Sequence, residues 1–449
     1  MTTSPPVRGT WATRLGFLLA SIGSAAGLGS MWRFSYLASE SGGAAFLVLY
    51  LVLIAVLGIP LLTAEFVTGR MMQAAPLAGL KRVAGPAWTP LAWLFALGGV
   101  VIMSYYAVVT GWTLRYFVDG VRGVVPADTG GYFGSVASGG GAVAALVLVM
   151  AITTGIAGAG VKGGLERANR FILPLRFLIL FALVIWAATL AGGGPGYAYY
   201  LKPDLAELTS ARVIERATGQ VFFSLSLGIG GMMTYASYLK SQENLAREAA
   251  TTALATTGAA VVAGLIVFPV IFHFGLSDRI AESAIGALFI AIPAGFEQMG
   301  RAGDLITALF FVMLLFAALM SAISILEVVV AAVVDVAGWP RRRAAWTCGA
   351  AITLLGVPSA LSADTLGAMD QIFGTFLLLV GGLGIAVLVG YRLGPQADAE
   401  LARGLPHAGV RRAWLFLLRF VAPPLIVWVL WSSLSPTWAA IKTLLGVTN

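Results

Sequence analysis

The stretch at residues 23–36, GSAAGLGSMWRFSY, lies inside an apolar run long enough to form a membrane-spanning helix. Gly23, Gly27 and Gly29 weaken a helix there, and Arg33 adds a fixed positive charge. A helix that opens in lipid leaves backbone groups unpaired, which is tolerated only against protein or a water-filled cavity. Its freed amides and half-helix ends would form a site for an anionic group and a cation. The alternative is that these small residues are close-packing contacts between helices.

The composition indicates a polytopic membrane protein. Of the 449 residues, 59% are hydrophobic and 11% are charged, whereas a soluble domain has about 25% charged residues. Most of the 28 Lys and Arg lie on one side of the predicted helices, which places the N-terminus in the cytoplasm and explains the basic charge without nucleic acid. A single cysteine and two separated histidines give no basis for an internal disulfide or a metal cluster.

Apolar runs of about 20 residues predict eleven spans. They cover residues 14–37, 44–68, 90–117, 141–158, 165–191, 214–238, 249–275, 303–336, 344–361, 366–391 and 411–433, with 279–298 as a folded external loop. The tail from Ser435 is too short and mixed for a confident twelfth span, so the odd count places the C-terminus outside. We therefore expect a cytoplasmic gate segment (1–13), a first five-helix repeat (14–192), an extracellular loop (193–213), a second, inverted repeat (214–394), and helix 11 with a short tail (395–449).

The sixth span is interrupted in the same way as the first. It contains GQVFFSLSLGIGGMMTYASY at 219–238, in which GIG at 228–230 echoes GLG at 27–29. The two breaks are five spans apart, and because five is odd the second copy lies inverted in the membrane. Two glycine-interrupted helices at matching places in two halves indicate the midplane binding site of a transporter.

Five motifs carry a resemblance to a known family: WATRLGF at Trp11, GLGSMWRF at Gly27, GIPLLTAEFVTGR at Gly58, GGLERANRFILP at Gly163 and GQVFFSLSLGIGG at Gly219. From Trp11 through span 11 the chain resembles the neurotransmitter:sodium symporter family, specifically its bacterial amino-acid transporter branch. The resemblance implies an all-α polytopic membrane protein with two inverted five-helix repeats, unwound helices 1 and 6, and an eleventh helix. It also implies a transporter rather than an enzyme.

The resemblance further implies how an amino acid is held. Its carboxylate would meet the amides of Leu28 and Gly29, at a half-helix N-terminus that favours anions, and the Tyr106 hydroxyl. Gly27 stands where amine-transporting relatives carry an Asp, so the substrate must bring its own carboxylate. Three isoleucines would favour a small or medium apolar side chain, although each could simply pack between helices. The full predicted substrate-binding set is Ser24, Ala25, Gly27, Leu28, Gly29, Ile102, Tyr106, Phe223, Ser224, Ser226, Ile229, Ser321 and Ile325.

Two gates are implied in the same way. Outside the site, Arg33 and Asp370 would pair above a lid formed by Tyr106 and Phe223. Inside, Arg8 would pair with Asp335, surrounded by Trp11, Ser237 and Tyr238. Glu65 and Glu166 are expected to satisfy freed backbone donors of helices 1 and 5, and helix 5 carries the Gly164 and Pro174 pair that the family uses for unwinding.

The implied ion sites depart from the family pattern. The family's first sodium site uses two Asn side chains, which here align with Ser30 and with Ala255, or with Thr256 after a one-residue shift. Its second site uses two adjacent hydroxyls, which here become Met320 and Ser321, and a soft thioether is a poor sodium ligand. The candidate sodium positions are Gly23, Ala25, Ala26, Ser30, Ser224, Ala317 and Ser321, with both sites depleted. Ala259 at the chloride position predicts no chloride.

Arg176 lies about a dozen residues into span 5, near mid-membrane, where a charge usually faces the bundle interior. We expect its guanidinium to replace the second sodium beside helices 1 and 8. The alternative is that it snorkels to the cytoplasmic surface.

We therefore predict a secondary transporter of a small or medium apolar amino acid in the bacterial inner membrane, a monomer or homodimer in the lipid bilayer. Sodium symport follows from the resemblance, with weak or absent coupling because both sites are depleted. The alternatives are a sodium-independent exchanger, uniporter or proton-coupled carrier, the last using Glu65 or Glu327 because Arg does not titrate, and a non-transporting amino-acid sensor.

Overall fold

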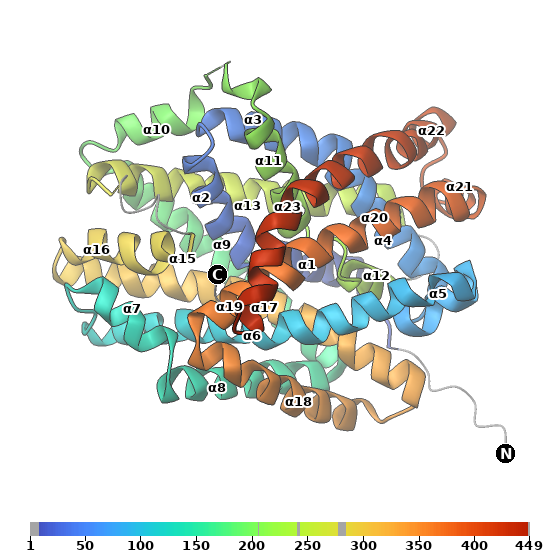
Figure 1. Ribbon diagram of the computed structural model, residues 1–449, viewed down its shortest axis with the longest axis horizontal. Helices are drawn as coiled ribbons and strands as arrows, with labels where there is room; N and C mark the ends of the chain where they lie inside the picture. Colours follow the sequence, from blue (N-terminus) through green and yellow to red (C-terminus); the bar gives the residue numbers. More distant parts are fainter. Residues whose placement is uncertain (1–8, 205, 240–242, 277–283, 448–449) are drawn as a thin grey trace.

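The computed structural model describes residues 9–204, 206–239, 243–276 and 284–447, and within these ranges all regular secondary structure is helical (Figure 1). The α-helices are α1 Arg14–Ala25, α2 Leu28–Ser39, α3 Ala44–Leu53, α4 Ile59–Met72, α5 Pro76–Ala84, α6 Thr89–Arg122, α7 Thr129–Ala137, α8 Gly140–Gly158, α9 Arg167–Ala188, α10 Gly194–Leu201, α11 Ala211–Ser224, α12 Gly231–Ala236, α13 Leu245–His273, α15 Ala284–Gly286, α16 Ile292–Glu297, α17 Arg301–Ala337, α18 Arg341–Leu361, α19 Ala363–Met369, α20 Leu378–Val387, α21 Gly394–Ala402, α22 Ala408–Phe416 and α23 Ala422–Leu444. The predicted all-α class is confirmed.

Several of these elements join into longer spans. The π-helical segments Ile54–Gly58, Asp370–Leu377 and Leu417–Val421 connect α3 to α4, α19 to α20, and α22 to α23. In the described part of the chain, nine helices are long and apolar enough to cross a membrane. The pair α1 and α2, bent by 63°, makes a tenth. The predicted sixth span is α11 with α12, which are separated by irregular backbone.

Two predicted segments differ from their observed form. The tail from Ser435 forms no separate twelfth span; it lengthens the eleventh beyond its predicted end at 433, as part of the continuous 37-residue run Ala408–Leu444. Pro436 lies inside this helix without ending it. The predicted loop at 193–213 contains α10, and the described part of the 279–298 segment forms α15, a π-helical turn and α16.

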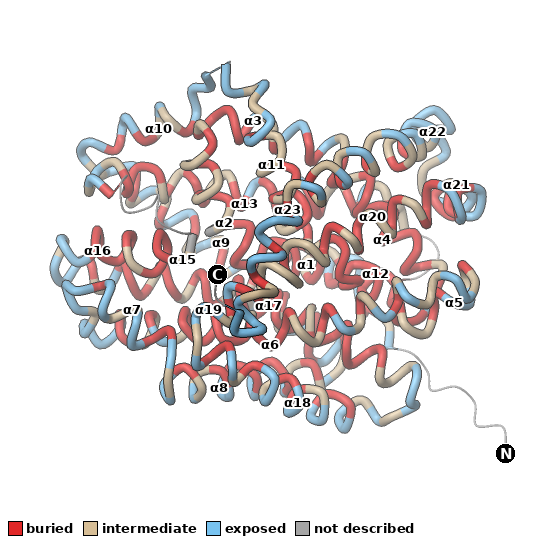
Figure 2. Tube along the Cα trace, viewed as in Figure 1, coloured by how far each residue is buried: buried red, intermediate tan, exposed pale blue. Residues whose placement is uncertain are grey.

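The broken helices lie at the centre of the bundle (Figure 1). The long helices α6 and α17 pack against each other, and α1 packs against α9, α13 and α17. Figure 2 shows buried residues concentrated at the centre, around α12 and α17, while α8 and α18 at the edge carry exposed positions. On α9, Phe171, Leu178 and Ile185 recur every seven residues and are 72%, 67% and 70% exposed. Such an exposed apolar stripe suits contact with lipid rather than water.

Candidate functional site

The first break separates α1 from α2 by two residues. Ala26 ends α1 with its amide bonded to the Ile22 carbonyl, and Gly27 begins α2 in an extended conformation (φ −76°, ψ −165°). The start of α2 exposes unpaired amides, and the Leu28 amide donates to the Tyr106 hydroxyl at 3.4 Å. The break therefore presents the carbonyl end of one half-helix and the amide end of another to the same space.

The second break, between α11 and α12, has a left-handed backbone at three positions. Ser226 has φ +51°, Gly228 has φ +81° and Gly230 has φ +77°. A Cβ at Gly228 would lie 2.1 Å from the Leu378 carbonyl oxygen, so glycine is required both for its conformation and for its close approach to α20.

Glu65 stabilises this second break. Its Oε1 accepts a hydrogen bond from the Gly228 amide at 2.8 Å. The expectation that Glu65 serves helix 1 or 5 is therefore wrong, because the unwound part of helix 6 presents the donor. Glu166 does serve helix 1: it accepts bonds from the Ala12 amide at 2.8 Å and the Thr13 hydroxyl at 2.9 Å.

A cavity lies between the two breaks, with about 60 Å³ of room for the centres of water molecules. All of the predicted substrate-binding residues line it except Leu28 and Ser224. Leu28 reaches Tyr106 through its amide, and the Ser224 hydroxyl accepts a bond from Gln220 Nε2 at 2.9 Å. Tyr105, Gly374 and Leu378 also line the cavity and were not predicted from the sequence.

The cavity has a polar end and an apolar wall. The Ser24 carbonyl accepts the Ser321 hydroxyl at 2.8 Å and the Ser226 hydroxyl at 3.3 Å. A Cβ at Gly27 would lie 2.1 Å from Ser321 Oγ, so a side chain at this position requires the Ser321 hydroxyl to move. The apolar wall comes from Ile102, Ile229 and Ile325.

The predicted outer gate is arranged differently from the expectation. The Arg33 guanidinium lies over the Phe223 ring, 4.6 Å from its centroid, and its Nη2 is 3.4 Å from Thr375 Oγ1. The charges of Arg33 and Asp370 interact, but the two side chains do not form a direct ion pair. Asp370 Oδ1 and the Tyr105 hydroxyl instead lie on the same side of Gly374, each 2.3 Å from where a Cβ on that glycine would be.

The predicted inner gate is only partly described, because Arg8 lies outside the described residues. Asp335 Oδ2 accepts the Ala75 amide at 2.7 Å. Trp11 Nε1 donates to the Tyr235 carbonyl at 2.9 Å, and the Tyr238 hydroxyl donates to Glu327 Oε1 at 2.6 Å. The Ser237 hydroxyl donates to a carbonyl of its own helix.

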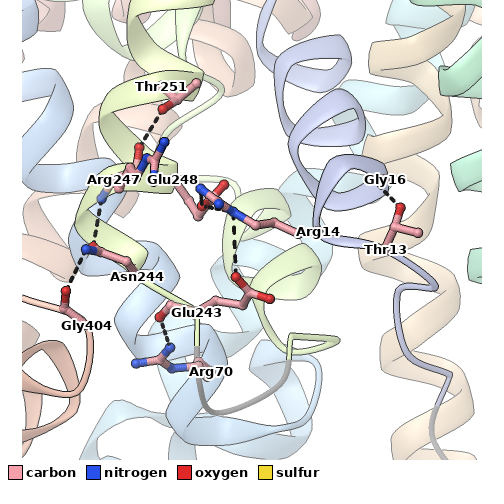
Figure 3. A network of polar contacts seen from close by, with 10 residues as sticks. All are labelled: Thr13, Arg14, Gly16, Arg70, Glu243, Asn244, Arg247, Glu248, Thr251 and Gly404. Atoms are coloured by element: carbon pink, nitrogen blue, oxygen red, sulfur yellow. Dashed lines mark hydrogen bonds and ion pairs between the residues drawn. The ribbon is translucent and has the colours of Figure 1, made fainter.

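A second set of contacts closes the same face, where α1 begins (Figure 3). Arg14 Nε donates to Glu248 Oε1 at 2.6 Å and lies 3.6 Å from Glu243 Oε2. Arg70 on α4 binds the Glu243 carbonyl and pairs with Glu400 on α21 at 2.6 Å. These contacts join α1 to the start of α13 and α4 to α21. Sequence reasoning missed them because the partners are far apart along the chain.

The residues predicted for the first sodium position retain oxygen atoms. Ser30 Oγ donates to the Gly27 carbonyl at 2.8 Å, and both it and Ser224 Oγ keep lone pairs. On α13, Thr256 is fully buried and its Oγ1 has no hydrogen-bond partner in the protein.

At the predicted second position an unpredicted side chain appears. Ala26 and Met320 lie in one buried cluster, in which the side chains of Ala255 and Ala259 pack, and Gly23 lies beside Met320. Ala317, one turn before Met320 on α17, is also fully buried. Asn169 on α9 places its Oδ1 where a Cβ at Gly23 would be 2.2 Å away, and that oxygen has no protein partner.

Arg176 is fully buried, which excludes the snorkelling alternative. Its Nη2 contacts Met31 Sδ on α2 at 2.9 Å, and its Nε and Nη1 have no hydrogen-bond partner. The polar α9 side chain nearest to Gly23 is Asn169, two turns earlier, whose Oδ1 would lie 2.2 Å from a Cβ on that glycine. These contacts lend no support to Arg176 as a substitute for the second sodium.

Comparisons with known proteins agree with one another. The family described as the Sodium:neurotransmitter symporter family matches residues 8–133 and 131–437. An uncharacterized sodium-dependent transporter of Bacillus subtilis, YhdH, is 34% identical over 95% of this chain and 97% of its own length. An uncharacterized sodium-dependent transporter of Methanocaldococcus jannaschii is 33% identical over 93% of this chain and 88% of its own.

A solved structure is similar over nearly the whole chain. The crystal structure of MhsT in complex with L-phenylalanine aligns with a TM-score of 0.86 and 38% identity, covering 95% of this chain and 100% of that one.

Proposed function

Because the chain belongs to the sodium:neurotransmitter symporter family, whose members are membrane transporters and not enzymes, we propose that it carries a small or medium apolar α-amino acid together with sodium. The observation that carries this proposal is the cavity between the two helix breaks, which has the ends of two half-helices on one side and isoleucines along its wall. The similarity to a phenylalanine complex of MhsT supports the substrate class.

The two ends of the first break suit the two charged groups of an amino acid. The amides of Leu28 and Gly29 lie at the start of α2, where the helix dipole favours a carboxylate, and the Tyr106 hydroxyl stands beside them. The carbonyl end of α1 at Ala25 favours the ammonium group, as do the carbonyls that end α11 at Phe223 and Ser224. Gly27 leaves the carboxylate role to the substrate.

The second predicted sodium position offers oxygen atoms of the kind that a hard cation requires. The carbonyls at the end of a helix have no intrahelical partner; at the end of α1 they include Gly23 in its last turn and Ala26, the residue that caps it. Asn169 adds an unpaired amide oxygen. A sodium ion held there would supply the coupling between substrate movement and the sodium gradient. We propose that this position, rather than the first, gives the coupling, and that chloride has no part.

We further propose that the protein lies in a bacterial inner membrane as a monomer or homodimer, with its N-terminus in the cytoplasm. The contacts of Arg14, Trp11 and Tyr238 would then close the cytoplasmic side. With α23 as the last of an odd number of spans, the C-terminus would lie outside.

Binding and uptake across a panel of amino acids test the proposal. The protein is purified, reconstituted in vesicles, and offered leucine, alanine, phenylalanine and tryptophan with sodium or with choline at constant ionic strength. We expect saturable, sodium-stimulated uptake of an apolar amino acid. Tryptophan bound more tightly than leucine or alanine would contradict the aliphatic pocket, and binding without uptake would favour a sensor.

A second candidate is a sodium-independent carrier. The observation that favours it is Arg176, a fully buried cation with two unpartnered nitrogens, which adds positive charge to the interior without any bound ion. Equal uptake in sodium and choline would support this candidate against the first.

A further inference from the structure

Asn169 is a buried amide with one unsatisfied end. The side chain is 1% exposed, on the face of α9 that packs against α1 and α17. Its Nδ2 donates to the Leu165 carbonyl one turn earlier, at 2.9 Å. That bond fixes the orientation of the amide and leaves Oδ1 as the free atom.

The free oxygen points at the end of α1. An added Cβ at Gly23 would lie 2.2 Å from Asn169 Oδ1 and 2.9 Å from Met320 Sδ, so both side chains converge on the same glycine. The surroundings are otherwise apolar, with Ile22, Leu173 and Ala259 in one buried cluster. An amide oxygen without a partner is costly in such surroundings, and its persistence indicates a ligand.

The neighbouring atoms define the chemistry of that ligand. The carbonyls of Gly23 and Ala26 stand at the end of α1, where helix geometry leaves them without amide partners and the dipole is negative. Asn169 Oδ1 is a further neutral oxygen. These oxygen atoms are neutral, as suits a small monovalent cation. Every candidate ligand atom except the Met320 sulfur is a hard oxygen.

We propose that Asn169 Oδ1, on α9, is a sodium ligand. It takes the place of the hydroxyl oxygen that the family pattern has on α17 and that Met320 lacks. The inference rests on the proposed sodium coupling and names one of its ligands. It places the ion among three helices, α1, α9 and α17, which the structure packs together. The apparent depletion at Met320 is thereby offset from α9, which contributes no oxygen ligand in the pattern that the family resemblance implies.

The decisive variant is Asn169→Leu, which keeps the approximate shape and removes the oxygen. The readout is the sodium concentration that gives half-maximal binding of the labelled amino acid to the purified protein, together with the shift in melting temperature between sodium and choline without substrate. We expect the half-maximal sodium concentration to rise about tenfold or more, equivalent to ~1.4 kcal/mol of coupling. The sodium-induced melting shift should shrink, and substrate affinity at saturating sodium should be retained.

Three further variants make the result interpretable. Asn169→Asp keeps the oxygen and adds a charge, so it should preserve sodium binding and covers the case in which Leu impairs folding. Met320→Thr adds a hydroxyl. As a single change it should lower the sodium concentration needed for half-maximal binding, and combined with Asn169→Leu it should bring that concentration part of the way back to the value of the unmodified protein. Thr153→Val is the matched control: Thr153 is equally buried and bonded to its own helix, on α8, which packs mainly against α6 and α18 and less extensively against α17. It should leave the sodium requirement unchanged.

Two results would overturn the inference, and they can be told apart. In the first, the unmodified protein depends on sodium and Asn169→Leu needs no more sodium than the unmodified protein. Oδ1 is then not a sodium ligand, while the proposed sodium coupling still holds. If the unmodified protein shows neither sodium-dependent binding nor a sodium-induced melting shift, the proposed coupling fails and the assignment fails with it.

Discussion

Removing one hydroxyl, in Tyr106→Phe, tests how the carboxylate is held. Tyr106 lines the cavity, and its oxygen lies 3.4 Å from the Leu28 amide, a long bond that leaves the hydroxyl able to bind a further group. The Tyr106 hydroxyl and Ser321 Oγ both lie beside Gly27, 3.1 Å and 2.1 Å from where its Cβ would be. Phenylalanine keeps the ring and its packing, so the change removes the hydrogen bond and little else.

A hydrogen bond to a charged group contributes about 1.5–3 kcal/mol. With ~1.4 kcal/mol for each tenfold change, Tyr106→Phe should weaken binding of the amino acid by roughly 10- to 150-fold. The measurement is equilibrium binding of a labelled apolar amino acid at saturating sodium, so that a loss of ion binding does not contribute.

The decarboxylated amine of the same substrate provides the control. It has no carboxylate, so it should bind weakly to the unmodified protein and lose nothing more in Tyr106→Phe. Our reasoning is refuted if the amine binds as well as the amino acid, or if the substitution weakens amino-acid binding less than twofold.

Three other changes test the cavity and the closed face. Ile102→Ala should shift preference toward larger apolar amino acids, measured by competition among leucine, phenylalanine and tryptophan; an unchanged order would remove Ile102 from the side-chain pocket. Gly27→Ala should abolish substrate binding, because its Cβ would lie 2.1 Å from Ser321 Oγ, and Ser321→Gly should partly restore it; full binding by Gly27→Ala would contradict the close approach. Arg14→Ala leaves the fully buried Glu248 without its cation, which typically costs about 3–5 kcal/mol for a buried pair and less here because Arg14 is 44% exposed. Its melting temperature should fall clearly below that of Arg14→Lys, and equal values would show that the pair is not stabilising.

The sequence predicted the two breaks because the cause of each is local. Glycines at 27, 29, 228 and 230 lie inside apolar runs, and such a pattern indicates a helix that cannot continue in lipid. The cavity between the breaks contains most of the residues that the resemblance implied, because those residues lie on the motifs themselves.

The missed residues approach from helices that carry no local signal. Tyr105 precedes a predicted residue, and Gly374 and Leu378 belong to a span with an ordinary apolar pattern, so only packing brings them to the cavity. The partner of Glu65 could not be predicted from the sequence either. A carboxylate in an apolar run needs hydrogen-bond donors, but the sequence does not say which helix provides them. The structure assigns it to Gly228 on the opposite repeat.

On helix α9 the sequence marks the charged residue Arg176 more clearly than the neutral residue Asn169. Arg176 stands out in an apolar span, whereas Asn169 lies among Glu166, Arg167 and Arg170 at the polar start of the same span and carries no charge. Seven residues separate them, about 10 Å along a helix at 1.5 Å per residue. That distance puts the guanidinium against Met31 beyond the break and the amide against Gly23 before it. A neutral oxygen beside the carbonyl end of α1 suits a cation there, and a guanidinium at that position would repel one. Asn169 therefore favours sodium binding, and Arg176 would oppose it. Because Asn169 is the one beside the carbonyl end of α1, the placement of the two side chains along α9 favours sodium binding.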